Sequence, residues 1–287
     1  MSFLPQLIAN SIISGSLYAI IAIGFAFLYD SVKFFDLAYG GVAVVGSYLF
    51  YYFFSELHLP LIFALVLALL ASSALAYVLY KSVYEHIRKK KASKLVLLIA
   101  SLGVFTVLQS LIAIFFTSEF RTFTSASVQE FTLLNASFTI VHLAMLASAL
   151  IIFTGLMLFR KYTSLGRAIV AVSDDEEVSK IVGINTKRVV GYVFAISGAI
   201  SALSGILVGF DTGIQPTMGL ILMLKGVIAA IIGGFGTLPG ALLGGYLLGF
   251  VENFGSFAIG GEWKDAIAFV LLILFLIIRP KGIIKRN

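Results

Sequence analysis

Residues 59–116 read LPLIFALVLALLASSALAYVLYKSVYEHIRKKKASKLVLLIASLGVFTVLQSLIAIFF. Two apolar runs of 22 residues flank a short segment, residues 81–94, in which six of 14 side chains are Lys or Arg. A helix needs about 20 apolar residues to cross a bilayer, and basic residues close to helix ends mark the cytoplasmic side. The stretch therefore predicts two membrane-spanning helices joined in the cytoplasm.

Two further basic clusters lie at residues 160–188 and in the tail, residues 279–286. Together with residues 81–94 they hold six, six and four of the 20 basic residues. We expect all three clusters, and so the C-terminus, to be cytoplasmic. Because three apolar blocks precede residue 81, the N-terminus is expected outside. Residues 1–10 have no basic n-region, so the first block is expected to be a retained span and not a cleaved signal peptide.

The composition excludes an ordinary soluble domain. The chain is 60% hydrophobic and 12% charged, with a mean hydropathy of +1.06, whereas soluble domains carry about 25% charged residues. The net charge of +6 is explained by the basic cytoplasmic segments and not by nucleic-acid binding. The absence of cysteine excludes disulfides and thiol chemistry.

Apolar blocks are separated by short polar segments, which predicts a single membrane domain over residues 1–287. The fold class is all-α, a polytopic integral membrane helical bundle with about nine spans, in a range of eight to ten. The expected blocks are residues 4–28, 37–54, 59–80, 95–116, 138–159, 189–210, 218–234, 239–257 and 265–278.

Small residues repeat at fourfold spacing in two blocks, which lets helix backbones approach closely in lipid. They are Ser197, Ser201, Gly205 and Gly209 in the sixth block, and Gly240, Gly244, Gly245 and Gly249 in the eighth, with Gly236 in the turn before it. Such a face either slides as the protein moves or simply packs.

The segment at residues 160–188 contains a short amphipathic helix outside the membrane. Ser173 and Glu176 have the spacing of a capping box, with Ser173 as N-cap, and Gly183 supplies a stop. The acids of the first turn suit the helix dipole; they are Asp174, Asp175, Glu176 and Glu177. One apolar face is formed by Val178, Ile181 and Val182. We expect a helix of about nine residues that docks in a partner's groove or lies on lipid headgroups.

Three stretches carry a resemblance to a known family. They are Ser164-Leu165-Gly166-Arg167-Ala168 with Glu176 and Val182-Gly183-Ile184-Asn185, then Gly233-Gly234-Phe235-Gly236-Thr237-Leu238-Pro239-Gly240-Ala241, and near the start Ser14-Gly15-Ser16-Leu17-Tyr18-Ala19-Ile20 with Ala22-Ile23-Gly24. The pattern resembles bacterial ABC importer permeases, and more narrowly the branched-chain amino acid permease subunits. The family's usual Asn-Phe-Ala-His-Gly is Asp36-Leu37-Ala38-Tyr39-Gly40 here, and Glu177-Val178 replaces the small pair that often follows the coupling-helix acid.

The resemblance implies a type II ABC importer-like permease of the bacterial inner membrane. It implies a second permease subunit, homologous or identical, two cytoplasmic ATPase subunits and an external substrate-binding protein. ATP and Mg would then be bound by the ATPases, and this chain would bind no cofactor. The segment from Gly166 and Arg167 through Gly183 would be the ATPase-coupling element.

Few residues could carry chemistry. The sequence has no phosphate-binding loop of the Walker type, its three His residues are isolated, and no nucleophile–base set is apparent. We expect no catalytic residue and no metal site. Lys225 and Glu252 lie inside spans, at equal sequence distances from the turn at residues 236–239, which predicts that both lie at the same depth. Our hypothesis is a buried ion pair with a gating or a static role; the alternative is that Lys225 extends outward to the membrane surface.

Asp36 precedes the glycine-rich start of the second block, where Gly40 and Gly41 lie. It is either a helix end facing a translocation pathway or a simple N-cap. Branched-chain amino acids are the expected cargo. Urea or short amides, sugars and nucleosides stay open, as does an ion-coupled secondary transporter, which would not explain the helix in the segment at residues 160–188.

Overall fold

The computed structural model describes residues 3–123, 130–133 and 136–284. The basic tail residues Lys285 and Arg286 lie outside this range. The described chain is mainly helical and contains one antiparallel hairpin, β1 (Glu130–Leu133) paired with β2 (Ala136–Thr139). The chain divides into two compact units, which are described separately below. The single membrane domain over residues 1–287 stays a prediction.

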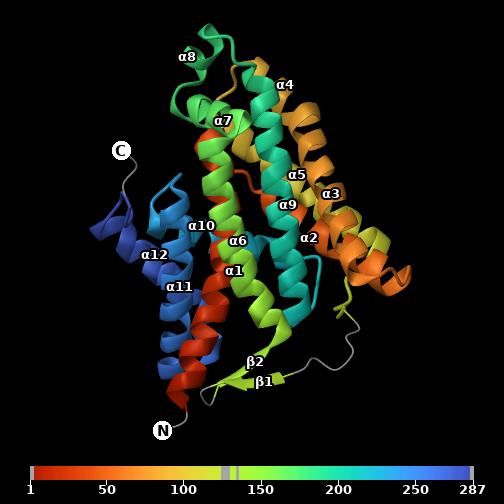
Figure 1. Ribbon diagram of the computed structural model, residues 1–287, viewed down its shortest axis with the longest axis vertical. Coiled ribbons are helices and arrows are strands. Elements are labelled where there is room, and N and C mark those ends of the chain that lie inside the picture. Colours follow the sequence, from red (N-terminus) through yellow and green to blue (C-terminus); the bar gives the residue numbers. More distant parts are fainter. Residues whose placement is uncertain (1–2, 124–129, 134–135, 285–287) are drawn as a thin grey trace. The chain divides into compact units, whose positions relative to one another are not determined.

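The helices follow the expected apolar blocks (Figure 1). In chain order they are α1 (Phe3–Val32), α2 (Ala38–Tyr51) with the π-helix η1 (Tyr52–Glu56), α3 (Leu61–Leu79), the π-helix η2 (Tyr80–Tyr84), α4 (Glu85–Lys89), α5 (Lys94–Phe116), α6 (Ile140–Tyr162), α7 (Ser164–Asp174), α8 (Glu176–Ile181), α9 (Thr186–Thr212), α10 (Met218–Gly233), α11 (Leu238–Ile259), the 3₁₀-helix η3 (Gly261–Trp263) and α12 (Lys264–Ile278).

Six helices of the described residues are long and apolar enough to cross a membrane. They are Phe3–Val32, Leu61–Lys89, Lys94–Phe116, Ile140–Tyr162, Thr186–Thr212 and Leu238–Ile259. The expected second, seventh and ninth blocks form α2, α10 and α12, which have 14, 16 and 15 residues. The count of about nine spans is therefore not confirmed, because these three helices are shorter than the apolar length that a span ordinarily needs.

Local signals explain where the helices begin and end. Ser93 caps α5, since its hydroxyl accepts the N–H of Val96. Pro239 occupies the first turn of α11, where its missing N–H costs no helical hydrogen bond. Gly213 and Gly260 follow α9 and α11 with φ of +84° and +113°, a backbone region that favours glycine.

The first compact unit comprises residues Met1–Ala26, Thr124–Phe153 and Leu224–Asn287. Here α11 packs against α1 and α10 through glycines. A Cβ added at Gly245 would meet the backbone of Ala19, and one at Gly244 would meet the backbone of Ala229. After α12 the chain returns to the end of α10, where the N–H groups of residues 283 and 284 donate to the carbonyls of residues 232 and 233 at 3.0 and 2.9 Å.

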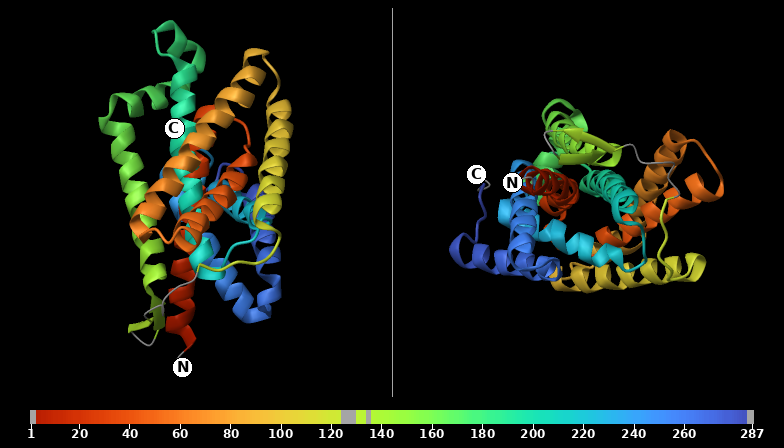
Figure 2. Two further views of the ribbon diagram at one scale, coloured as in Figure 1. Left: turned by 90° about the vertical axis from the view of Figure 1, so that its right-hand side faces the viewer. Right: turned by 90° about the horizontal axis from the view of Figure 1, so that it is seen from below.

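The second compact unit comprises residues Phe27–Phe123 and Thr154–Met223. Its centre is α2, which packs against α3, α5 and α9 (Figure 2). All but three residues of α2 are buried, so this helix is surrounded by protein and not by lipid. An aromatic cluster of Phe50, Phe123 and Phe210, with ring centroids 4.7–5.3 Å apart, closes one end of the packing.

Candidate functional site

The end of α6 and α7 meet at a glycine. The hydroxyl of Thr163 accepts the N–H of Gly166 at 2.9 Å and caps α7. A Cβ at Gly166 would collide with the backbone of Phe159 and Arg160, so only glycine allows α7 to turn this closely across the end of α6 (Figure 2). Ile169 and Val172 of α7 are buried.

The predicted capping box is wrong. Ser173 lies inside α7, and its hydroxyl donates to the carbonyl of Val170 at 2.9 Å. The N-cap of α8 is Asp175, whose carboxylate accepts the N–H groups of Glu177 and Val178 at 2.8 and 3.0 Å. Because burial of Ile169 and Val172 carries α7 on to Asp174, α8 has six residues where about nine were expected. Sequence spacing suits either cap, and tertiary packing selects Asp175.

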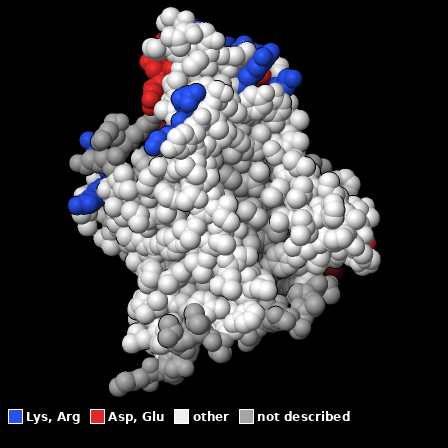
Figure 3. Space-filling view, in the orientation of Figure 1, with Lys and Arg blue, Asp and Glu red and all other residues white. Residues whose placement is uncertain are grey.

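The apolar side chains of α8 and its C-cap face outward. Val178, Ile181 and Val182 are 54%, 83% and 69% exposed. Gly183 has a φ of +89°, so the expected stop at this residue is present. Lys, Arg, Asp and Glu side chains gather over α4, α7 and α8 (Figure 3). An apolar stripe in a charged setting is typical of a surface that a partner covers.

Glu176 is tied to another helix. Its carboxylate lies 2.5 Å from Nη2 of Arg88 in α4 and 2.9 Å from Nζ of Lys180. Asp174, Asp175 and Glu177 are not buried. Arg167 is exposed, and its guanidinium donates to the carbonyl of Tyr162 at 3.5 Å. The sequence identified Glu176, in the segment at residues 160–188, but not its partner Arg88, which lies in the basic cluster at residues 81–94.

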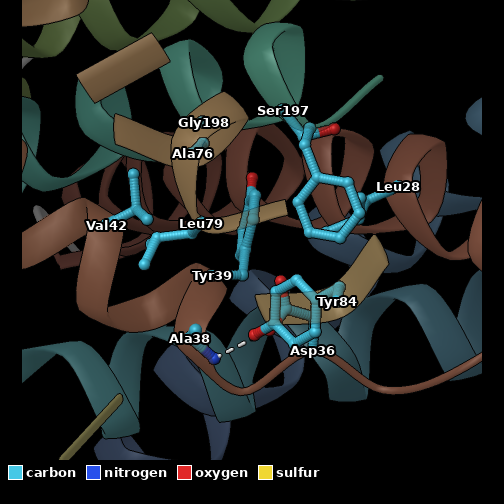
Figure 4. Close-up of a pocket in the computed structure, with 11 residues that line it drawn as sticks. Leu28, Asp36, Ala38, Tyr39, Val42, Ala76, Leu79, Tyr84, Ser197 and Gly198 are labelled. Carbon is cyan, nitrogen blue, oxygen red and sulfur yellow. Dashed lines mark hydrogen bonds between the residues drawn. The ribbon is translucent and has the colours of Figure 1, made fainter. Parts of the chain in front are cut away.

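Asp36 lies in the segment that joins α1 to α2 and is 3% exposed. Its Oδ1 accepts the hydroxyl of Tyr84 at 2.7 Å and the N–H of Ala38 at 3.0 Å (Figure 4). Leu37, not Asp36, occupies the N-cap position of α2. Asp36 precedes the N-cap residue, and its carboxylate accepts the N–H of Ala38, the first residue of the helix. Burial raises the pKa of Asp36 to about 6, against the opposing effect of the two hydrogen bonds.

A small pocket adjoins Asp36 (Figure 4). Its volume of about 10 Å³ is enough for one water molecule. Apolar side chains, including Leu28, Val42 and Leu79, form most of its wall, and Ser197 contributes a hydroxyl. The pocket in this conformation does not hold an amino acid.

Gly40 and Gly41 allow close packing within the same unit. A Cβ at Gly40 would meet the backbone of Gly219, and one at Gly41 would touch Leu108. Both glycines therefore have a packing role, and their assignment to a gate stays a prediction.

Lys225 and Glu252 form the expected ion pair in the first compact unit. Nζ of Lys225 lies 3.3 Å from Oε1 of Glu252, which is fully buried, and 2.9 Å from Oδ1 of Asp265. The hydroxyl of Tyr18 donates to Oε2 of Glu252 at 2.5 Å. Sequence reasoning missed Tyr18 and Asp265. Asp265 could have been found from the sequence, because it is a charged residue at the edge of the last apolar block.

The small residues of the sixth block lie in a packing interface. Ser197, Ser201, Gly205 and Gly209 are all buried. The hydroxyl of Ser201 donates to the carbonyl of Tyr39 at 2.6 Å, and a Cβ at Gly205 would collide with the backbone of Ala43.

In the turn before α11, Gly236 has a φ of +74°, and Gly240 contacts the backbone of Gly233.

A third buried carboxylate was not identified from the sequence. Asp30, near the end of α1, is 1% exposed and lies 2.9 Å from Arg160 and 3.2 Å from Lys33. It ties Arg160, a residue of the second basic cluster, to α1.

Among the described residues no group of three or more His, Cys, Asp or Glu side chains could hold a metal ion.

Comparison with known proteins identifies the family. Residues 7–276 match the model of the branched-chain amino acid transport system permease component. The chain is 32% identical over 298 residues to the high-affinity branched-chain amino acid transport system permease protein BraD of Pseudomonas aeruginosa, with 99% of this chain and 96% of the relative covered. It is 31% identical to LivH of Escherichia coli K12 over the same shares.

A solved structure supports the fold. PsaBC from Streptococcus pneumoniae in complex with Fab is similar with a TM-score of 0.55 and 14% identity, over 95% of this chain and 91% of that chain. Together with the apolar helices, the family match makes this a multi-pass inner-membrane protein. The chain belongs to the family of branched-chain amino acid transport system permease components.

Proposed function

We propose that this chain is the translocating permease subunit of an ATP-driven importer of branched-chain amino acids. The observation that carries the proposal is similarity over nearly the whole chain to BraD and LivH, both named as high-affinity branched-chain amino acid permeases. The subunit has no catalytic residue of its own in this proposal, and it moves its solute by alternating access between two conformations.

The proposed assembly contains two permease subunits, two ATPases and an external binding protein. The ATPases bind ATP and Mg, and α8 with Val182 sits in a groove of one of them. The exposed apolar stripe of Val178, Ile181 and Val182 supports this placement. A six-residue helix needs the surface of another protein to cover such a stripe, and a groove on a partner provides it. The ion pair of Glu176 with Arg88 gives α8 a contact through which ATPase closure reaches α4.

The proposed orientation places residues 81–94, residues 160–188 and the C-terminus in the cytoplasm, and the N-terminus outside. It takes α2 with η1, α10 and α12 as spans in addition to the six long apolar helices. The positive-inside rule supports the orientation. The cluster of Lys225 and Glu252 is a candidate gate whose ion pair breaks as the pathway opens.

Uptake measurements test the solute. The chain is expressed with the ATPases, second permease and binding protein of its system in cells lacking branched-chain amino acid importers. We expect uptake of radiolabelled leucine, isoleucine or valine that stops when the chain is omitted. Uptake of urea or ribose without any of these amino acids would reject the proposed cargo.

Ile181→Asp tests the docking surface. Since Ile181 is 83% exposed, the change should leave the subunit folded but weaken co-purification of the ATPase and reduce uptake. His86→Asp, at an exposed residue of α4, is the matched control. Wild-type ATPase association in Ile181→Asp would remove α8 as the coupling element.

A further inference from the structure

A basic cavity of about 240 Å³ lies where η2 and α4 approach α8 and the start of α9, within the second compact unit. Five cationic side chains contribute to its wall: Arg88, Lys89, Lys91, Lys180 and Lys187. Two carboxylates, Glu85 and Glu176, also line it. The lining therefore carries a formal charge of +3, which favours an anionic occupant.

Ion pairs hold three of the cations in place. Arg88 and Lys180 both contact Glu176, at 2.5 and 2.9 Å. Lys89 lies 2.8 Å from Glu85. These pairs engage both carboxylates of the wall, so Lys91 and Lys187 make no ion-pair contact with either of them. The hydrogen bond from Lys89 lowers the pKa of the Glu85 carboxyl, and the charge of Lys187 is still close enough to help lower it.

Lys91 and Lys187 reach the cavity from different elements. Among the described residues neither forms an ion pair with a carboxylate. Lys91 follows the C-cap of α4 with a φ of +52°, so a turn, and not the helix, carries it to the cavity wall. Lys187 is the second residue of α9.

The start of α9 adds a second source of positive potential. Thr186 and Lys187, the first two residues of this 27-residue helix, both line the cavity. The first N–H groups of a helix have no partner inside it, and the helix dipole makes this end positive. Asn185 caps α9 and accepts the N–H of Arg188 at 3.2 Å, which leaves the N–H groups before it for a ligand. Lysines beside a helix N-terminus match a phosphate group, which carries concentrated charge and several acceptor oxygens.

The surface next to the cavity suits lipid. Tyr80 contributes to the cavity wall, and one turn earlier Tyr77 lies against Tyr192 of α9 with ring centroids 6.3 Å apart. Tyr192 is 47% exposed and Val78 is 55% exposed. Exposed tyrosines beside apolar side chains are typical of the membrane–water boundary, so acyl chains can lie along α3 and α9 while a headgroup enters the cavity.

We propose that this cavity binds a phosphate group, held by Lys91, Lys187 and the start of α9, and supplied by an anionic phospholipid headgroup or by a soluble phosphate compound. The exposed Tyr192 beside the exposed Val78 favours the lipid source. The proposal goes beyond transport and does not depend on which solute is carried.

Native mass spectrometry of the full-length chain in neutral detergent tests the site. The chain is titrated with phosphatidylglycerol and with phosphatidylcholine of the same acyl chains, and separately with inorganic phosphate and ATP. The variant is Lys91→Gln with Lys187→Gln. The control, Lys81→Gln with Lys161→Gln, removes the same charge from two exposed lysines that do not line the cavity. Thermal unfolding verifies that both double variants are folded.

We expect the wild type and the control to bind phosphatidylglycerol more tightly than phosphatidylcholine. The Lys91/Lys187 variant should lose about thirtyfold in affinity for phosphatidylglycerol and none for phosphatidylcholine. If the variant instead loses only binding of inorganic phosphate or ATP, the phosphate site stands and its lipid source is rejected. If the variant and the control bind all four ligands equally, the cavity is not a phosphate site.

Discussion

At the scale of single residues, Lys225 lies between two carboxylates of unequal burial. Glu252 is fully buried, whereas the side chain of Asp265 is 58% exposed. Removing Lys225 takes away the ion-pair partner of buried Glu252, which keeps the Tyr18 hydroxyl as a hydrogen-bond donor and the more distant charge of Lys264. Removing the charge of Glu252 leaves Lys225 paired with Asp265. A charge buried without its partner is strongly destabilising, so the two substitutions should differ.

We expect Lys225→Ala to lower stability by about 3–5 kcal/mol and Glu252→Gln to lower it by less. The double variant should recover part of the Lys225→Ala loss. Thermal unfolding of the purified chain in detergent measures all three. Strictly additive effects in this double-mutant cycle would mean that the two charges do not interact.

The carboxylate of Asp36 is bound by hydrogen bonds that an amide oxygen can also accept. Asp36→Asn should therefore leave stability nearly unchanged, because Tyr84 and the N–H of Ala38 keep an acceptor. Asp36→Leu should cost about 1–3 kcal/mol or more, because it removes the acceptor of two buried donors, the Tyr84 hydroxyl and the Ala38 N–H. Equal unfolding temperatures for the Leu and Asn variants would show that these hydrogen bonds do not contribute.

At the scale of elements, α8 is a short helix whose order depends on its cap. Isolated helices shorter than about 12 residues are marginal in water, and α8 has six residues, of which only Ser179 is buried. The Asp175 cap orders its first turn, and the ion pair of Glu176 with Arg88 ties it to α4.

Asp175→Ala should loosen α8, since it removes the acceptor for the N–H groups of Glu177 and Val178 at a cost of about 0.5–2 kcal/mol. Ser173→Ala is the matched control, because Ser173 lies inside α7 and caps no helix. Hydrogen exchange at the amides of residues 176–181 measures the difference. Faster exchange in the Ser173 variant than in the Asp175 variant would contradict this assignment of the cap.

At the scale of the whole molecule, the basic residues are the main guide to orientation. The chain has no cysteine, so single cysteines at residues 90 and 175 can be labelled without a background. We expect an impermeant thiol reagent to label neither in intact cells and both after permeabilisation. Labelling of residue 175 from outside would reject the orientation and the role of α8 in docking an ATPase.

The sequence alone determined the apolar blocks, the basic clusters between them and the family resemblance, because hydropathy, charge and motif are local properties of the chain. It also predicted that Lys225 and Glu252 lie at the same depth, since both are equally far from one turn, and only the tertiary structure shows that they meet. Tertiary structure alone decided that Tyr18 and Asp265 join this pair, that Arg88 holds Glu176, and that Asp175, not Ser173, caps α8. Each of these depends on how helices are rotated and packed, and spacing along one helix does not specify how it faces another.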